Sequence, residues 1–273
     1  LEKFMFKRQE EKMFINFINI PIFLKHLWQK KIYYLGIRQR TSYQKYFIVD
    51  QSKKGNINNM SCSISSIYYC PVKTLSFQSI ETCNVKKDLG MTNDRIFAFS
   101  RGVDLNKAKS MEKNPNERKL NNLLTLKNSP TLNKYNFTYN KNRLSLNLKE
   151  KELITISTDI HEEKTKLSEK LNELEKSLAK PIFLLKNIEF PFFDTSNSNN
   201  IFNSISLINL NSVRDFEKKI NEKVEFQRFR GNFYIDGVDA HEERNWIGKT
   251  IKINNTSFKV EKNIPRCVAI NLK

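Results

Sequence analysis

The stretch Ser63-Ile-Ser-Ser-Ile-Tyr-Tyr-Cys-Pro-Val-Lys73 has the composition of a β-strand that ends at a proline. Isoleucine and tyrosine favour strands. Pro71 has no N–H to donate to a neighbouring strand, so it ends the strand or places it at a sheet edge. A second apolar strand, Ile96-Phe-Ala-Phe99, follows the polar residues Asn93-Asp-Arg95. The chain after residue 60 is therefore predicted to open with strands.

A hairpin and an amphipathic helix are predicted next along the chain. Residues 135–139 and 143–148 flank Asn140-Lys-Asn142, a spacing that predicts a β-hairpin. Leucines then recur at steps of three and four residues until Pro181, which predicts an amphipathic helix of about four turns. These leucines are Leu167, Leu171, Leu174 and Leu178.

The last third of the chain is predicted to hold one more helix and then strands. Asn211 or Ser212 is expected to cap a helix with Val213, Phe216 and Ile220 on one face. Strands are predicted over residues 229–235, 249–253 and 257–260. The order of strands, two helices and strands predicts an α+β protein built on a β-barrel.

Composition limits the classes of function. The chain has 273 residues with a formal net charge of +18, from 47 Lys and Arg against 29 Asp and Glu. Such an excess favours polyanionic partners such as nucleic acid, anionic lipid or phosphorylated cofactors. Hydrophobic residues make up 39% of the chain, which is typical of a soluble globular protein. Because the basic residues are dispersed and no RNP-like motif is present, nucleic-acid binding ranks last among the hypotheses.

The first 59 residues differ from the rest. Their apolar run, residues 13–24, is interrupted by two asparagines and Pro21, and it is shorter than the roughly 20 residues that a spanning helix needs. No cleavage site of the secretory type follows it. A peripheral membrane anchor is one interpretation. The favoured one is a basic leader, either outside the translated protein or disordered, with Met60 as the start.

Cysteine usage points to a reducing compartment. The four cysteines, at positions 62, 70, 83 and 267, include no C-x-x-C pair, so a cytoplasmic location without structural zinc is expected. Arg266 directly precedes Cys267, and an adjacent cation favours the thiolate, which is the form that binds soft metals. The alternative is a buried structural cysteine, the interpretation adopted for the other three.

A second group of residues could bind an anion. Arg228 and Arg230, on a predicted strand, would point to the same face and could clamp a phosphate. The alternative is a solvated edge strand with a β-bulge at Gly231. Lys73-Thr74 and Asp94-Arg95 offer further anion-binding groups at the ends of the first two strands.

Taken together, these fragments resemble the MOSC family, named after the C-terminal domain of molybdenum cofactor sulfurases. Residues 67–75 and 89–97 resemble the first strands of the N-terminal β-barrel domain of these proteins. Later landmarks resemble, in order, those of the MOSC domain itself: Phe193-Asp-Thr-Ser196, Ser206-Leu-Ile-Asn-Leu210, Arg228-Phe-Arg-Gly-Asn232, Trp246-Ile-Gly248 and Pro265-Arg-Cys267. The resemblance implies an N-terminal β-barrel domain over 60–150 and a MOSC domain over 151–273.

The resemblance also implies a site for molybdenum cofactor. In the branch that includes the mitochondrial amidoxime reducing component, the cysteine of the Arg-Cys motif ligates molybdenum, which here is Cys267. The pterin and its phosphate would be held by residues from both parts of the chain. These are Lys73, Thr74, Arg95, Thr195, Ser196, Arg230 and Asn232.

Several functions are compatible with this resemblance. The first is an oxidoreductase that reduces small N-hydroxylated compounds with electrons from a separate flavoprotein or iron–sulfur protein. The second is a sulfur or cofactor carrier that holds a persulfide on Cys267. Some MOSC proteins are linked to pyridoxal phosphate, but no anchoring lysine is evident here.

Three departures from the family pattern bear on these expectations. The chain ends six residues after Cys267, so the domain is expected to lack its C-terminal part. No four-cysteine ferredoxin cluster is present. Gly231 stands where relatives commonly have proline or alanine, which is expected to loosen its strand.

Overall fold

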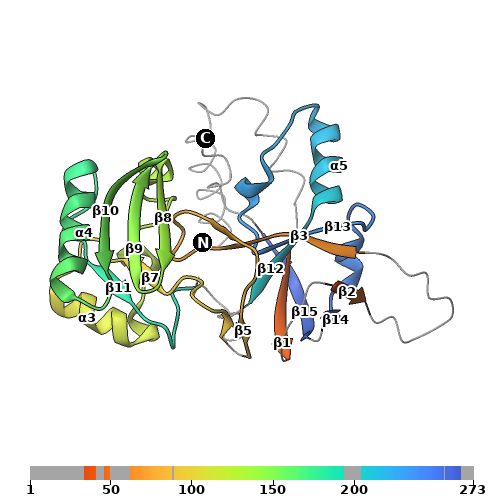
Figure 1. Ribbon diagram of the computed structural model, residues 1–273, viewed down its shortest axis with the longest axis horizontal. Helices are drawn as coiled ribbons and strands as arrows, with labels where there is room; N and C mark the ends of the chain where they lie inside the picture. Colours follow the sequence, from red (N-terminus) through yellow and green to blue (C-terminus); the bar gives the residue numbers. More distant parts are fainter. Residues whose placement is uncertain are drawn as a thin grey trace, which may run out of the picture.

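The computed structural model describes residues 34–40, 46–49, 62–87, 89–193, 204–254 and 256–265. These residues form two halves that lie side by side (Figure 1). One half holds the helices α3 (Leu105–Lys113) and α4 (His161–Leu174). The other holds α5 (Leu210–Ile220) and the larger sheet. The α+β class predicted from the sequence is confirmed.

The larger sheet has eight strands among the described residues, in the order β13-β12-β1-β15-β14-β2-β3-β4. β13 pairs with β12 in parallel and also pairs with β3 in antiparallel fashion, with Phe233 opposite Ile67. Strands from the two ends of the chain are therefore adjacent in this sheet. In chain order the strands are β1 (Tyr34–Arg40), β2 (Tyr46–Val49), β3 (Cys62–Tyr69), β4 (Gln78–Ile80), β12 (Ile205–Asn209), β13 (Phe233–Asp236), β14 (Thr250–Ile253) and β15 (Thr256–Ile264).

Two strands of this sheet lie within the first 59 residues, the predicted basic leader. β1 lies between β12 and β15 and is antiparallel to both. β2 lies between β14 and β3. Residues upstream of Met60 therefore form part of the larger sheet. The start of translation at Met60 stays a prediction.

Smaller sheets form the other half. β8 (Tyr135–Asn140), β9 (Arg143–Leu148) and β10 (Lys151–Ser157) pair as an antiparallel sheet, and β7 (Phe97–Phe99) pairs with β11 (Leu184–Lys186). The predicted hairpin is therefore confirmed. The predicted domain boundary between residues 150 and 151 falls in the turn between β9 and β10, which pair with each other.

A short ribbon and a buried core complete the arrangement. β5 (Val85–Lys86) pairs with β6 (Gly90–Met91).

The core of the α3–α4 half is rich in aromatic rings, with edge-to-face contact between Phe97 and Tyr139 at 5.0 Å between centroids. Edge-on contacts of this kind add to the stabilisation that burial of the rings already gives.

α5 covers one face of the larger sheet. Val213 and Phe216 are buried on the inner side of the helix, where Phe216 meets Phe229 edge to face. Each such side chain contributes about 1.5–3 kcal/mol through burial. The Asn209 side chain accepts a hydrogen bond from the N–H of Asn211 and caps the helix. The predicted cap at Asn211 or Ser212 was therefore placed two or three residues late.

Two further predictions were wrong in detail. The structure places α4 at His161–Leu174, earlier than the leucine run suggested, because Glu162 and Glu163 form its first turn. The strand predicted over 229–235 does not begin at residue 229. A 3₁₀ turn, Phe226–Phe229, ends there, and the next residue, Arg230, has a positive φ of 54°. β13 begins only at Phe233. Arg228 and Arg230 are therefore not two residues apart on one strand.

Candidate functional site

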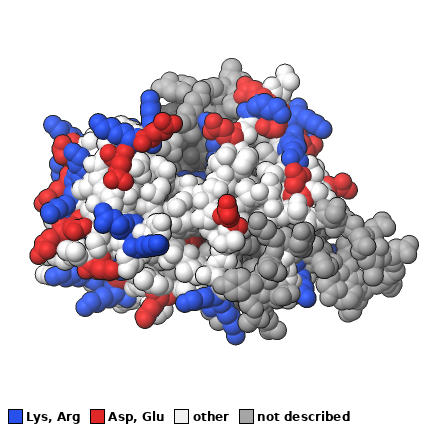
Figure 2. All heavy atoms as spheres, viewed as in Figure 1, with Lys and Arg blue, Asp and Glu red and all other residues white. Residues whose placement is uncertain are grey.

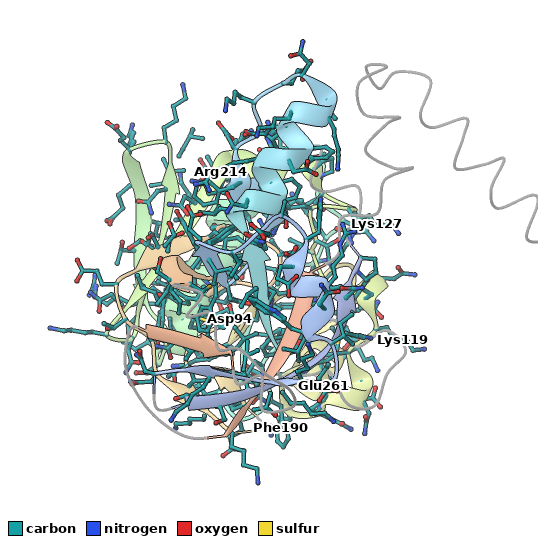
Figure 3. The ribbon with its side chains drawn as sticks, turned by 90° about the vertical axis from the view of Figure 1, so that its right-hand side faces the viewer. Asp94, Lys119, Lys127, Phe190, Arg214 and Glu261 are labelled. Atoms are coloured by element: carbon teal, nitrogen blue, oxygen red, sulfur yellow. The ribbon has the colours of Figure 1, made fainter. Side chains whose placement is uncertain are left out.

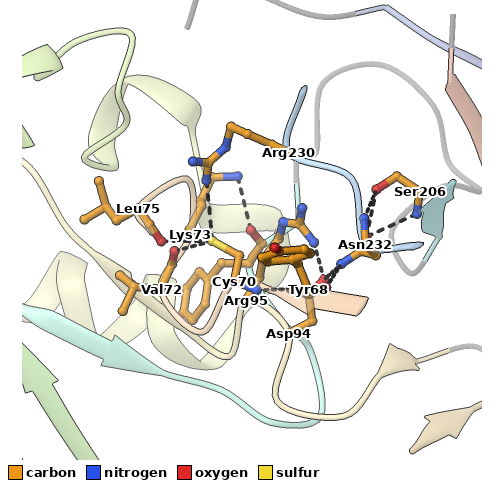
Figure 4. Close-up of polar contacts among 11 residues, drawn as sticks. Tyr68, Cys70, Val72, Lys73, Leu75, Asp94, Arg95, Ser206, Arg230 and Asn232 are labelled. Carbon is orange, nitrogen blue, oxygen red and sulfur yellow. Dashed lines mark hydrogen bonds and ion pairs between the residues drawn. The ribbon is translucent and has the colours of Figure 1, made fainter. Parts of the chain in front are cut away.

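The carboxylate of Asp94 joins three segments of the chain. Asp94 is 1% exposed and lies in the interior of the molecule, in the turn before β7 (Figure 3). Its Oδ1 accepts a hydrogen bond of 2.7 Å from the N–H of Cys70. Its Oδ2 forms an ion pair with Arg95 and accepts from Nδ2 of Asn232 at 3.4 Å (Figure 4). Burial of a carboxylate costs much less free energy when the group is hydrogen-bonded and paired with a cation in this way.

Asn232 connects this point to the larger sheet. Its side-chain Nδ2 donates to the carbonyl of Tyr68 at 3.1 Å. Its Oδ1 accepts from both the N–H and the hydroxyl of Ser206, at 3.1 and 2.8 Å. Asn232 thus links β3, β12 and the turn at Asp94, which explains why an amide with both donors and acceptors is needed here.

The buried thiol of Cys70 closes the loop that follows β3. Its Sγ lies 2.8 Å from the carbonyl oxygen of Val72 and 3.0 Å from that of Leu75. The loop between these contacts carries Lys73 and Thr74, and Thr74 has a positive φ of 58°. A left-handed conformation at a β-branched residue is costly and persists only where its surroundings hold it.

Three cations lie around this thiol (Figure 4). Nη2 of Arg230 is 3.6 Å from Sγ of Cys70, and its guanidinium stacks 4.4 Å above the ring of Phe77. Burial raises the pKa of the Cys70 thiol, while Arg230, Arg95 and Lys73, in decreasing order, oppose that rise. Arg230 contacts the sulfur directly, and the N–H of Arg95 donates to the carbonyl of Cys70 at 2.6 Å, whereas Lys73 lies in the loop that this thiol closes.

Lys73 is the most deeply buried of these cations. Its side chain is enclosed, with the residue 1% exposed, and Nζ donates to the carbonyl of Phe192 at 3.1 Å. An ammonium group is rarely buried unless it is paired or binds a ligand. The nearby Thr74 Oγ1 is buried and has no hydrogen-bond partner among the described residues.

Among the described residues, the balance of charge at this site is positive. The carboxylate of Asp94 contacts the cluster, which in the described part of the chain also holds the cations of Lys73, Arg95 and Arg230. Burial raises the pKa of Asp94, whereas Arg95, the N–H of Cys70 and Asn232 oppose that shift. On the face shown in Figure 2, by contrast, Lys and Arg side chains alternate with Asp and Glu over the half that holds α3 and α4.

The structure brings together five of the residues predicted from the sequence. Lys73, Thr74, Arg95, Arg230 and Asn232 all lie at the cluster that surrounds Cys70 and Asp94. The ligand predicted for molybdenum, Cys267, lies outside the described residues, as do Thr195 and Ser196. Arg228 takes a separate position, with Nε 3.8 Å from Oε2 of Glu225.

Cys70 and Ser206 were not predicted as parts of the site, and Asp94 only as part of an anion-binding pair. Cys70 was interpreted as a structural cysteine, and its contacts with two carbonyls agree with a structural role. The signal for Asp94 is its position between a turn residue and Arg95, directly before a buried strand. Ser206 carries no such signal, because a serine in a buried strand has many explanations.

Comparison with known families identifies part of this chain. Residues 194–273 match the family model of the MOSC domain. These residues are therefore similar to a MOSC domain. Arg230, Asn232 and Ser206 lie within it, whereas Lys73, Asp94 and Arg95 precede it. The cluster therefore joins the MOSC domain to the part of the chain before it. No curated protein matches the chain in a sequence comparison.

Two features are absent from the described residues. No group of three or more His, Cys, Asp or Glu side chains in this part of the chain is arranged to hold a metal ion. No helix within it is long and apolar enough to cross a membrane.

Proposed function

We propose that this protein binds the phosphorylated pterin of molybdenum cofactor at the cluster around Cys70. MOSC domains as a family are associated with this cofactor. The observation that carries the proposal is the convergence of Lys73, Arg95 and Arg230, from three segments, around the buried Cys70 (Figure 4). A terminal phosphate carries up to two negative charges and several acceptor oxygens, which match these donors.

The residues at the cluster fit such a group. Arginine guanidinium groups bind phosphate through two parallel donors, and Lys73 adds a point charge. The unpartnered hydroxyl of Thr74 is available to donate to a phosphate or pterin oxygen. Asp94 holds the guanidinium of Arg95 in place, and the Cys70 thiol fixes the loop that carries Lys73 and Thr74.

We propose further that the protein is an oxidoreductase for small N-hydroxylated or N-oxygenated compounds. In this proposal Cys267 is the molybdenum ligand, and Thr195 and Ser196 lie close to the cofactor. When bound, the cofactor supplies the redox centre for the reduction. Electrons would come from a separate flavoprotein or iron–sulfur partner, and the reaction would take place in the cytoplasm.

A barrel for the larger sheet is part of the same proposal. β13 pairs with β12 on one side and with β3 on the other, and β3 pairs with β2. Together with the pairings through β1, β15 and β14, these contacts follow a closed cycle of strands. Such a cycle supports a closed sheet, which is the shape expected for a MOSC domain.

Molybdenum content per protein chain tests the proposed function. Wild type, Cys267→Ser and Cys83→Ser are purified from a host that makes the cofactor. We expect near-stoichiometric molybdenum in the wild type and in Cys83→Ser, and loss of the metal in Cys267→Ser. Absence of molybdenum and pterin from a well-folded wild type would overturn the proposal and favour a persulfide carrier.

A further inference from the structure

Arg118 lies beneath the segment that leads into the MOSC domain. It follows a 3₁₀ turn, Pro115–Glu117, and is 4% exposed. Nε donates to the carbonyl of Met111 at 2.8 Å, and Nη2 donates to that of Glu112 at 3.1 Å. These two contacts attach the guanidinium to the last turns of α3.

The other donors of Arg118 point to the segment 190–193. Nη1 donates to the carbonyl of Phe190 at 2.5 Å and to that of Pro191 at 3.2 Å. The guanidinium also lies 4.0 Å from the ring centroid of Phe192. One side chain therefore holds four carbonyls and an aromatic ring, and so ties this segment to α3.

The segment held by Arg118 contacts both of the site's cations that precede the MOSC domain. The carbonyl of Phe192 accepts from Nζ of Lys73 at 3.1 Å, and its N–H donates to the carbonyl of Arg95 at 2.7 Å. The ring of Phe193 lies 5.1 Å from the guanidinium carbon of Arg95. The placement of Lys73 and Arg95 thus depends on where residues 192 and 193 are held.

Arginine is suited to this position for a physical reason. Burial lowers the pKa of Arg118 to about 10, so the group remains protonated at neutral pH. A buried charge is costly unless its donors are satisfied. A planar guanidinium offers five donors in a fixed geometry, whereas lysine offers one small ammonium group and could reach only some of these carbonyls.

We propose that Arg118 is a positioning residue for the cofactor site. It fixes residues 190–193, and through them it presents the Phe192 carbonyl to Lys73 and the Phe193 ring to Arg95. The consequence for binding rests on the proposed function of Lys73 and Arg95 as phosphate-binding cations. The effect on the position of Lys73 does not depend on that proposed function.

Competitive labelling of lysines with trace acetic anhydride tests this directly on the full chain. The label on Lys73, which is 1% exposed, is measured by mass spectrometry relative to Lys127, an exposed lysine at the edge of the molecule in Figure 3. We expect Arg118→Ala to raise the relative labelling of Lys73 about tenfold or more. The variant loses the hydrogen bonds from the guanidinium to the segment 190–193, and each hydrogen bond to a charged group corresponds to at least a tenfold change in an equilibrium constant. Arg118→Lys should give a smaller rise. Millimolar guanidinium should lower the labelling of Arg118→Ala again.

Glu175→Gln is the matched control. Glu175 is also buried in this half, where it accepts from the Tyr135 hydroxyl at 2.9 Å, but it does not contact the segment 190–193 among the contacts described. It should lower thermal stability without changing the labelling of Lys73. Equal labelling of Lys73 in wild type and Arg118→Ala, or an equal rise in Glu175→Gln, would overturn the inference.

Retention of phosphorylated pterin is the second readout. If the wild type holds pterin, Arg118→Ala should lose at least half of it, whereas Glu175→Gln should keep it. Full retention in Arg118→Ala would overturn the role in binding. If the wild type holds no pterin, the proposed function fails, while the labelling result still decides the placement of Lys73.

Discussion

The backbone N–H of Cys70 donates to the carboxylate of Asp94 across 2.7 Å, and this bond joins the end of β3 to the turn before β7. The same carboxylate pairs with Arg95 and contacts Asn232. Asp94 therefore determines the relative positions of three segments that carry the proposed site.

Asp94→Asn should destabilise the fold. The substitution keeps the shape of the side chain but removes the charge that offsets the Arg95 guanidinium and one acceptor of the network. We expect a loss of about 2–4 kcal/mol in the free energy of unfolding. Urea denaturation measures it. Asp159→Asn is the control, because Asp159 forms an exposed ion pair with Lys186 and should cost less than about 1 kcal/mol. Equal losses in the two variants would contradict the role of Asp94.

Gly231→Ala should also lower stability, through a steric contact. A Cβ at this position would lie 2.3 Å from Cδ1 and 2.7 Å from Cγ1 of Ile208, which is buried. The isoleucine would have to leave its rotamer, at a cost of about 1–3 kcal/mol.

A double-mutant cycle separates this contact from other effects. Ile208→Val removes Cδ1, so Gly231→Ala should cost less free energy in that background than in the wild type. Additive losses of unfolding free energy would show that the contact is not the cause. The N–H of Gly231 also donates to the Tyr234 hydroxyl at 2.9 Å. Proline here would lose that hydrogen bond.

Removal of residues 1–59 should destabilise the larger sheet. Without β1, strands β12 and β15 each lose an antiparallel partner. Unpaired edges also favour aggregation. We expect the chain that starts at Met60 to have a lower melting temperature than the full chain, together with a greater tendency to associate. Calorimetry and light scattering measure the two effects. An unchanged melting temperature would show that β1 contributes nothing to stability and would favour Met60 as the start.

The thiol of Cys83 should react slowly with alkylating reagents in the native protein. Burial raises its pKa from 9.0 to about 11, with a smaller contribution from Asp94. The thiolate is the reactive form of the side chain. At pH 8 its population in the native protein is about a hundredfold lower than in the unfolded chain, so alkylation is slowed to the same extent. The native rate should keep rising with pH to about 11, whereas the rate in urea should level off above about 9. Mass spectrometry of the Cys83 peptide follows both. A native profile that levels off near 9 would contradict the shift.

Local patterns in the sequence predicted part of this fold well. The hairpin β8–β9 follows from alternating apolar residues on either side of Asn140-Lys-Asn142, and strands β14 and β15 follow from the same kind of pattern. The segment 228–232 was misassigned because its residue types suit a strand. The positive φ at Arg230 depends instead on packing that no short window of sequence contains.

The candidate site, too, was predictable from the sequence only in part. Lys73, Arg95, Arg230 and Asn232 were predicted because each lies in a family motif, and the structure places them together. The contacts that hold them, from Cys70 to Val72 and from Arg118 to Phe190, are made to backbone carbonyls. Every residue has a carbonyl, so the identity of the acceptor leaves no trace in the sequence.

The pairing of β3 with β13 has a consequence for the order in which the chain acquires its structure. Ile67 must find Phe233, and almost the whole α3–α4 half lies between them in the sequence. Contacts between residues so distant in sequence slow folding, because a long loop must close before any of them forms. During synthesis the hairpin of β8 and β9 can form early, and β3 can pair with β2 and β4, but its pairing with β13 must wait until β13 has been made. Arg230 would therefore join Lys73 and Arg95 at Cys70 only near the end of folding.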